Sequence, residues 1–293
     1  MMNNIIAILQ DLDSQLAPAQ VERIREKLTS MLNYRPRIGV FGKTGVGKSS
    51  LCNALFGKPI CAISDIEACT RDPQEVMLNM ENGKGITLLD VPGVGENLQR
   101  DEEYSELYRK LLPELDMVLW VLKADDRAYS VDIEFYTNVV KPHLQQGKPF
   151  ILVLNQVDKI EPFRDWDGEN RKPGPSQAQN IALKAANVAT HFQVKQSLVV
   201  PVSADEKFGL TKLVDEIIFS LPDEKKVSIA REVPAENLST ESKAEVKNSL
   251  SRVLTRTLTG VATGAALGSK IAGKAGAVVG GVIGGIGGFL GLW

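Results

Sequence analysis

The sequence of 293 residues has few of the residues that build disulfide frameworks or metal clusters. It holds three cysteines without C-x-x-C spacing and two isolated histidines, His143 and His191. An odd number of scattered cysteines argues against a disulfide-stabilised secreted domain and favours a reducing compartment. We therefore expect a cytoplasmic protein in which neither histidine holds a metal.

An excess of basic charge is also absent, since the formal net charge is −2 and the isoelectric point about 5.9. Wholesale nucleic-acid binding is therefore not favoured, and we expect no nucleic-acid partner. The first residues lack the basic segment of a signal peptide, and Asp11 and Asp13 interrupt their apolar run.

Residue patterns divide the chain into four expected segments. These are an N-terminal helical hairpin (1–35), a domain of alternating strands and helices (36–221), a polar linker (222–241), and an amphipathic helix followed by a glycine-rich tail (242–293). The hairpin could wrap the core of the domain or bind a partner.

Six apolar runs predict the strands of the second segment: 37–41, 74–78, 85–90, 116–122, 149–155 and 197–203. Helical patterns lie between them, which predicts an α/β fold with a mostly parallel six-stranded sheet and helices on both faces. The polar stretch 159–177 predicts a long loop, in which Trp166 is either an interface anchor or a local hydrophobic contact.

Residues 42–49 read GKTGVGKS and match G-x-x-x-x-G-K-[ST] at every fixed position, between a predicted strand and a predicted helix. Glycine lets backbone N–H groups approach a phosphate chain and allows the positive φ angles that point them inward. The start of the helix adds partial positive charge. We expect Lys48 to reach the β and γ phosphates and the Ser49 hydroxyl to bind Mg²⁺.

Two further motifs follow at strand ends. In NQVD, Asp158 can accept hydrogen bonds from N1–H and the exocyclic amine of guanine, which adenine cannot offer, and Asn155 would contact the guanine edge. In DVPG, Asp90 can hold Mg²⁺ through a water, and the Gly93 amide can meet a γ-phosphate.

Together with CTRD (69–72) and VSA (202–204), these motifs resemble the Era/TrmE/septin-like branch of P-loop GTPases, in the order of that family. The resemblance covers about residues 36–221. It is strongest to the small prophage-encoded Era-like GTPases of the YfjP/YeeP type. It implies a P-loop NTPase fold that uses GTP, GDP and Mg²⁺. It also implies that Thr70 coordinates the metal and that Ser203 and Ala204 touch guanine O6.

The motifs and the resemblance together give three sets of candidate residues. The catalytic candidates are Lys48, Thr70 and Gly93, and the metal ligands are Ser49, Thr70 and Asp90. The nucleotide contacts are Gly42, Lys43, Thr44, Gly45, Val46, Gly47, Lys48, Ser49, Ser50, Asn155, Gln156, Asp158, Ser203 and Ala204.

The sequence departs from the family pattern at two of these motifs. Gln156 replaces the usual lysine of N-K-x-D, so a positive charge is missing and guanine affinity is expected to fall. Val94 follows D-x-x-G and cannot orient water as a glutamine does. We expect a switch with slow intrinsic hydrolysis that self-association or a partner stimulates. The alternative is a septin-like assembly switch with negligible turnover.

The tail holds 12 of the 25 glycines. From residue 260 a small residue recurs every four positions, as one smooth stripe on a helix: Gly260, Gly264, Gly268, Ala272, Gly276, Gly280, Gly284 and Gly288. Three interpretations stay open. The tail could be a glycine zipper at the inner face of a membrane (residues 260–293), a helix that packs in a homodimer or oligomer, or a flexible segment.

Overall fold

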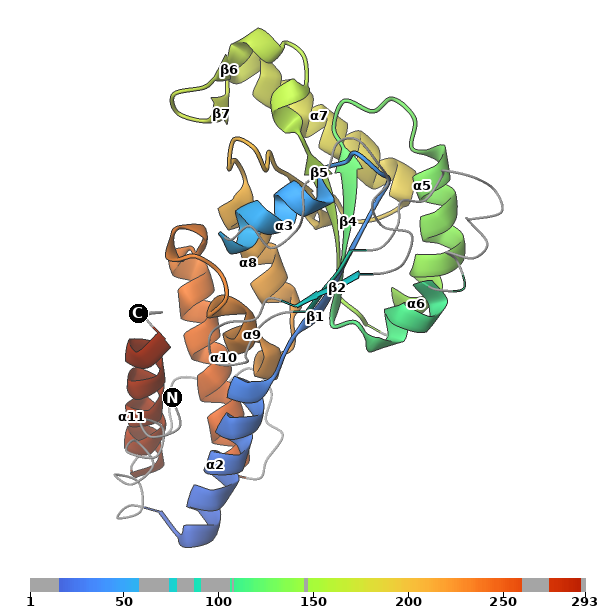
Figure 1. The fold of residues 1–293 in the computed structure, drawn as a ribbon. Helices are drawn as coiled ribbons and strands as arrows, with labels where there is room; N and C mark the ends of the chain where they lie inside the picture. The colour runs from blue at the N-terminus through green and yellow to red at the C-terminus, as the bar shows by residue number, and fades with distance from the viewer. Residues whose placement is uncertain are drawn as a thin grey trace. The chain divides into compact units, whose positions relative to one another are not determined.

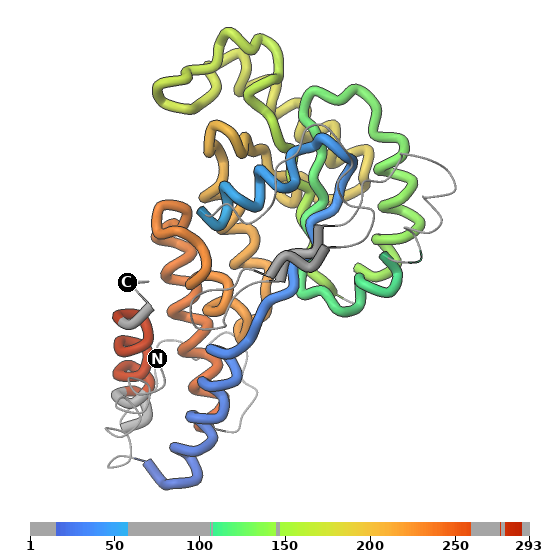
Figure 2. Tube along the Cα trace, in the orientation of Figure 1, coloured from blue at the N-terminus to red at the C-terminus, as the bar shows by residue number. Residues whose placement is uncertain are grey.

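A computed structural model of the chain describes residues 16–57, 74–77, 87–90, 106, 108–144, 147–259 and 274–290. Contacts between residues divide the chain into two compact units. One unit is Pro36–Ile217, and the other combines Met1–Arg35 with Ile218–Trp293. Figure 1 draws their helices and strands, and Figure 2 traces the same course along the chain.

Residues 36–217 form an α/β fold around one main sheet. Its six strands within the described residues are β2 (Gln74–Met77), β3 (Thr87–Asp90), β1 (Arg37–Phe41), β4 (Met117–Lys123), β5 (Phe150–Asn155) and β8 (Val199–Pro201), in that spatial order. All neighbouring pairs are parallel except β2 with β3. The mostly parallel sheet predicted from the sequence is therefore confirmed.

The sequences of β4 and β5 explain their central place in the sheet. They read MVLWVLK and FILVLN, and all their residues except Lys123 are buried. A strand covered on both faces reads as a continuous apolar run, because neither row of side chains meets water. The register pairs Leu122 with Leu154 and Lys123 with Asn155, so the ends of the two strands lie together.

Helices cover both faces of this sheet. They are α3 (Lys48–Phe56), α5 (Ser130–Phe135), α6 (Lys141–Leu144), α7 (Pro175–Phe192) and α8 (Leu210–Ser220), and a π-helical turn (Tyr136–Val140) joins α5 to α6. Figure 1 shows α3 and α8 on one side of the sheet and α5 with α6 on the other. Under α5, the ring of Trp120 lies 5.7 Å from that of Phe135, which anchors this layer to β4.

The predicted loop 159–177 holds short ordered elements. The 3-10 turns Val157–Lys159 and Phe163–Asp165 precede a two-stranded hairpin of β6 (Trp166–Asp167) and β7 (Lys172–Pro173). The Asp165 carboxylate accepts hydrogen bonds from the backbone N–H groups of Ser176 and Gln177, at 3.0 and 3.1 Å. This contact caps the start of α7 and fixes the end of the loop.

The second unit is helical where it is described. Its helices are α2 (Pro18–Asn33), α9 (Asp223–Ala230), α10 (Thr240–Thr259) and α11 (Lys274–Leu290), with a 3-10 turn at Ala235–Asn237. The apolar side of α2, which includes Ile24 and Leu28, is buried, and α2 contacts both α9 and α10. The first helix of the predicted N-terminal hairpin lies outside the described residues.

The segment 222–241, predicted as a linker, holds the helix α9. Val227 and Ile229 are buried on this helix. Lys226 is also buried, and its ammonium pairs with Glu245 of α10. The sequence looked like a linker because charged residues are usually exposed, whereas here a charged side chain is buried in a pair.

Helix α11 contacts α10. The buried residues of α11 include Val279, Val282, Ile283 and Ile286. The glycine face is turned away, since Gly280, Gly281, Gly284 and Gly288 are exposed and a Cβ on each would meet no atom within 4 Å. Among the residues described, no helix combines the length and apolar character needed to cross a membrane.

Candidate nucleotide-binding site

The phosphate-binding motif forms the turn between β1 and α3, as the sequence predicts. Gly42, Gly45 and Gly47 have φ angles of 142°, 79° and 86°, which glycine adopts far more readily than other residues. A Cβ on Gly42 would lie 2.2 Å from the backbone oxygen of Val121, so no side chain fits there. The loop therefore has the close, glycine-dependent turn that a backbone cradle for phosphate needs.

The other residues of the motif take different positions around this turn. Thr44 and Gly45 lie at the exposed tip, Val46 is buried, and Ser49 and Ser50 lie in the first turn of α3.

The two lysines of the motif are held differently. The Lys48 ammonium donates hydrogen bonds to the backbone oxygens of Gly42, at 3.1 Å, and Lys43, at 3.2 Å. The Lys43 ammonium pairs with the buried carboxylate of Asp132 on α5. The ammonium of Lys48 thus lies against the loop itself, whereas that of Lys43 joins the loop to α5.

Asn155 connects the phosphate-binding turn to two other loops. It is the last residue of β5, and its side chain is buried. Its Nδ2 donates to the backbone oxygen of Val46 at 2.9 Å, and its Oδ1 accepts from the N–H of Ala204 at 3.1 Å. A Cβ on Gly47 would lie 2.5 Å from the same Nδ2, so the close approach needs glycine at this position too.

Gln156 makes a second link to the phosphate-binding turn. Its Nε2 donates to the backbone oxygen of Gly45 at 3.2 Å. Its Oε1 accepts a hydrogen bond from the Lys159 ammonium at 2.8 Å. The residue has a φ of 62°, a left-handed conformation that costs a non-glycine residue about 1–2 kcal/mol. Strain of this kind often marks a functional site.

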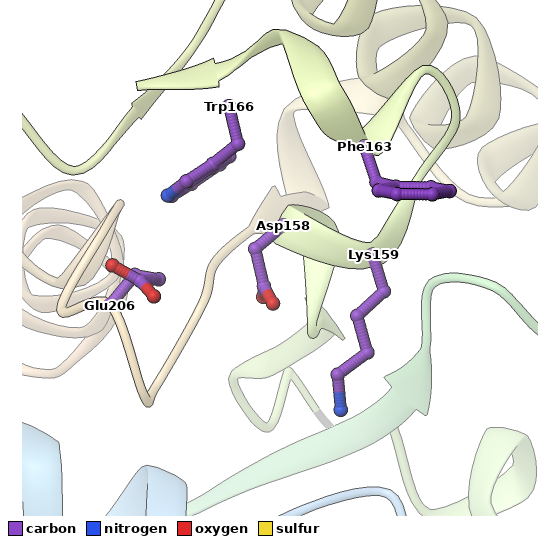
Figure 3. Close-up of a pocket in the computed structure, with 5 residues that line it drawn as sticks. All are labelled: Asp158, Lys159, Phe163, Trp166 and Glu206. Carbon is purple, nitrogen blue, oxygen red and sulfur yellow. The ribbon is translucent and has the colours of Figure 1, made fainter. Parts of the chain in front are cut away.

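Asp158 lines a pocket of about 360 Å³ together with Lys159, Phe163, Trp166 and Glu206. In Figure 3, Phe163 and Lys159 lie on one side of Asp158, and Trp166 and Glu206 lie on the other. The Oδ1 atom of Asp158 is buried and has no hydrogen-bond partner among the described residues. A buried acceptor without a partner is costly, so the pocket suits a ligand that brings a donor.

Ser203 and Ala204 form the loop after β8. Backbone hydrogen bonds of 3.0 Å in both directions pair Ser203 with Phe208, and the Ser203 hydroxyl accepts from the N–H of Glu206 at 3.3 Å. These bonds hold the loop beside Asn155 and bring Glu206 to the wall of the Asp158 pocket.

The predicted metal ligands are placed only in part. Asp90 ends β3 and pairs in register with Val40, so it lies beside the strand that leads into the phosphate-binding turn. Ser49 lies at the start of α3. Thr70 and Gly93 lie outside the described residues, as does Val94. Across the described ranges, no three His, Cys, Asp or Glu side chains form a cluster suited to a metal ion. Ser49 and Asp90 thus stay predicted ligands, of the oxygen-bearing kind that suits Mg²⁺ together with water and phosphate oxygens.

Sequence reasoning missed the pocket roles of Lys159 and Glu206. The only signal was their position, directly after Asp158 in one case and two residues after Ala204 in the other. Trp166 makes a local contact, since its ring lies 5.6 Å from that of Phe208 in an edge-on arrangement. It also lines the pocket, which neither interpretation of this residue included.

Residues 37–156 match the family described as 50S ribosome-binding GTPase. The chain is 43% identical to the uncharacterized protein YkfA of Escherichia coli K12, over 69% of this chain and 68% of YkfA. It is 41% identical to the uncharacterized protein YfjP of the same strain, over 74% of each chain. GTPase Era of Aquifex aeolicus is 30% identical, over 64% of this chain and 56% of Era.

A glycine turn between a parallel strand and a helix, beside a second strand that ends in the guanine-type motif, defines a P-loop nucleotide-binding domain. The extent of the match to YkfA and YfjP makes the assignment more specific. The chain belongs to the Era-like family of bacterial P-loop GTPases.

Proposed function

We propose that this protein binds GTP with Mg²⁺, hydrolyses it slowly to GDP and phosphate, and acts as a molecular switch. The observation that carries the proposal is the buried, unpartnered Oδ1 of Asp158 in a pocket on the same sheet edge as the glycine turn. In this proposal the turn holds the phosphates and Asp158 selects the base.

The specificity rests on the fit between donors and acceptors. Guanine presents two N–H donors that one carboxylate can accept, and adenine leaves that carboxylate unpaired. The Ala204 N–H and the amide of Asn155 are fixed next to this pocket by their mutual hydrogen bond. The Lys48 ammonium, now on loop carbonyls, would exchange these contacts for phosphate oxygens.

We assign the metal to Ser49, Asp90 and Thr70, of which Asp90 would act through a water. Bound Mg²⁺ neutralises developing charge on the phosphates and orients them. Thr70 and the Gly93 amide would sense the γ-phosphate, so that its loss releases the two loops that carry them. These two roles come from the motifs and the family.

Slow turnover follows from Val94, whose side chain cannot orient the attacking water. The missing group would then come from a second copy of the chain or from a partner. If turnover is instead negligible, the protein would be a GTP-dependent assembly switch. Single-turnover hydrolysis at several protein concentrations separates these cases, because self-stimulation makes the specific activity fall on dilution.

The test of base selection is Asp158→Asn. Loss of hydrogen bonds to a charged acceptor should weaken GTP binding by about ten- to a hundredfold. ATP should not compete with GTP on the unchanged protein. Glu169→Gln, an exposed change on the β6–β7 hairpin, should bind GTP normally. Equal affinity of the unchanged protein for ATP and GTP, or binding of neither, would refute the proposal.

For the tail, we propose that the glycine face of α11 makes a further contact, with the inner face of a membrane or with another helix. The exposed glycines of α11, opposite its buried branched residues, support this idea. Fractionation of the intact chain beside a version that ends at Leu258 is the test. The same solubility and the same number of chains per particle for both versions would rule out both contacts.

A further inference from the structure

The glutamine of the NQVD motif does not act alone in this chain. The amide of Gln156 reaches the phosphate-binding turn with its nitrogen and receives the Lys159 ammonium on its oxygen. We propose that Lys159 is a positioning residue for guanine-nucleotide binding and that it supplies, through Gln156, the positive charge that the glutamine lacks. This inference rests on the proposed function, since it concerns the same site.

A path of hydrogen bonds joins Lys159 to the phosphate-binding turn through Gln156. Lys159 donates to Gln156 Oε1 at 2.8 Å, and Gln156 Nε2 donates to the backbone oxygen of Gly45 at 3.2 Å. A cation on the oxygen of an amide polarises it and strengthens the donor on its nitrogen. The ammonium of Lys159 therefore reinforces the grip of Gln156 on the exposed tip of the phosphate-binding turn.

The backbone of Gln156 gives a second reason. Its left-handed φ of 62° is unfavourable for a residue with a side chain, and such a conformation persists only where surrounding contacts hold it. The contacts that hold the side chain are those to Gly45 and Lys159. Lys159 thus supports the conformation that places Gln156 between the base pocket and the phosphate turn.

The charges that line the pocket also favour this role for Lys159. The wall of the pocket carries two carboxylates, Asp158 and Glu206, and the ligand adds the negative charges of its phosphates. Lys159 is the cation on that wall, and in Figure 3 its side chain extends in the same direction as that of Asp158. An ammonium at this point offsets repulsion between the carboxylates and an anionic ligand.

The contribution should appear in ligand binding and not in folding. The side chain of Lys159 is exposed, as is its bond to Gln156. Exposed polar pairs add little to stability because water competes for both partners. Removal of the ammonium should therefore leave the nucleotide-free protein folded.

The experiment compares GDP affinity, measured by calorimetry at low and high salt, for the full chain and four variants: Lys159→Ala, Gln156→Lys, the double variant, and Lys195→Ala. Lys195 is an exposed lysine outside the site and is the matched control. We expect Lys159→Ala to weaken GDP binding roughly three- to tenfold at low salt and less at high salt. The melting temperature without nucleotide should not change.

The double variant decides whether charge is the reason. A lysine at position 156 carries its own charge, so Lys159→Ala should have little further effect in the Gln156→Lys background. GDP affinity of Lys159→Ala equal to that of the full chain, or the same loss in both backgrounds, would overturn the inference while leaving GTP binding intact. If the full chain binds no guanine nucleotide, both the inference and the proposed function fail.

Discussion

The ammonium of Lys43 lies 2.7 Å from Oδ2 of Asp132, a carboxylate whose side chain is only 1% exposed. The other oxygen of Asp132 accepts a hydrogen bond from the indole N–H of Trp120 at 3.3 Å. One buried carboxylate thus joins the phosphate-binding turn to α5 and to the middle of the sheet. Burial raises the pKa of Asp132, and the hydrogen bond and charge of Lys43 oppose that rise.

This pair predicts a pH dependence of stability. Because the pKa of Asp132 is higher in the folded protein than its usual value near 3.8, the folded state binds the proton more tightly than the unfolded state. The free energy of unfolding, compared with that of Asp132→Asn, should therefore fall as the pH rises above about 3.8, by at most about 1.4 kcal/mol per pH unit. Urea unfolding at a series of pH values measures the difference.

The comparison with Asp132→Asn removes the effect of every other carboxylate, because both proteins share them. A difference in the free energy of unfolding that does not change with pH would contradict the raised pKa. A difference that grows as the pH rises would show that the ionised pair stabilises the fold.

The glycine turn predicts two different outcomes for the same substitution. Gly42→Ala places a Cβ 2.2 Å from the backbone oxygen of Val121, which cannot move without distorting β4. Gly45→Ala meets nothing within 4 Å, so its cost is only that of a positive φ, about 1–2 kcal/mol. Thermal unfolding without nucleotide should show the larger loss for Gly42→Ala, and equal losses would mean that the turn adapts.

Much of this fold is readable in the sequence because its signals are local. The central strands are continuous apolar runs, and the phosphate-binding turn, Asn155 and Asp158 each belong to short motifs. The contacts that set the chemistry of the site are not local. Lys43 pairs with Asp132, which lies far along the chain on α5. Gln156 donates to Gly45, which precedes it by 111 residues. No spacing rule marks such pairs in one sequence.

Charged residues of this chain are hard to interpret from the sequence where the fold buries them. Lys226 and Glu232 made residues 222–241 resemble a polar linker, yet both are less than a tenth exposed. Glu232 pairs with Arg231, whose guanidinium also donates to the backbone oxygen of Leu32. A charge whose partner lies on another helix, as Glu245 does for Lys226, is indistinguishable in the sequence from a solvated one.

Asn155 should matter for stability as well as for binding. Asn155→Ala removes the hydrogen bonds to Val46 and from Ala204 and leaves buried backbone groups without partners. We expect a loss of about 2–4 kcal/mol in the free energy of unfolding of the nucleotide-free protein. The control is Asn187→Ala, at an exposed position on α7, which should change stability by less than about 0.5 kcal/mol. Similar losses for the two variants would mean that the three loops are not joined through Asn155.

The two faces of α11 predict opposite effects on stability. Ile283→Ala removes a buried side chain from the face that packs in the helical unit and should cost about 2–4 kcal/mol in the local stability of α11. Gly284→Ala lies next to it on the exposed face, where a Cβ meets no atom within 4 Å. It should raise helix stability by about 0.5–1 kcal/mol, because alanine loses less backbone entropy than glycine. Hydrogen exchange of the α11 amides measures both.

Gly284→Ala also tests whether the glycine face of α11 is exposed to solvent or packs against a second helix. If the face contacts nothing, the substitution stabilises α11 and leaves the mass in solution unchanged. If a second helix approaches closely along the glycines, a methyl group at this position holds it off, and the assembly weakens although the helix itself is stronger. Sedimentation of the intact chain and of Gly284→Ala, which differ by one methyl group, therefore tests the helix-packing interpretation of the tail. A stable assembly that is indifferent to this methyl group would exclude close packing along that face.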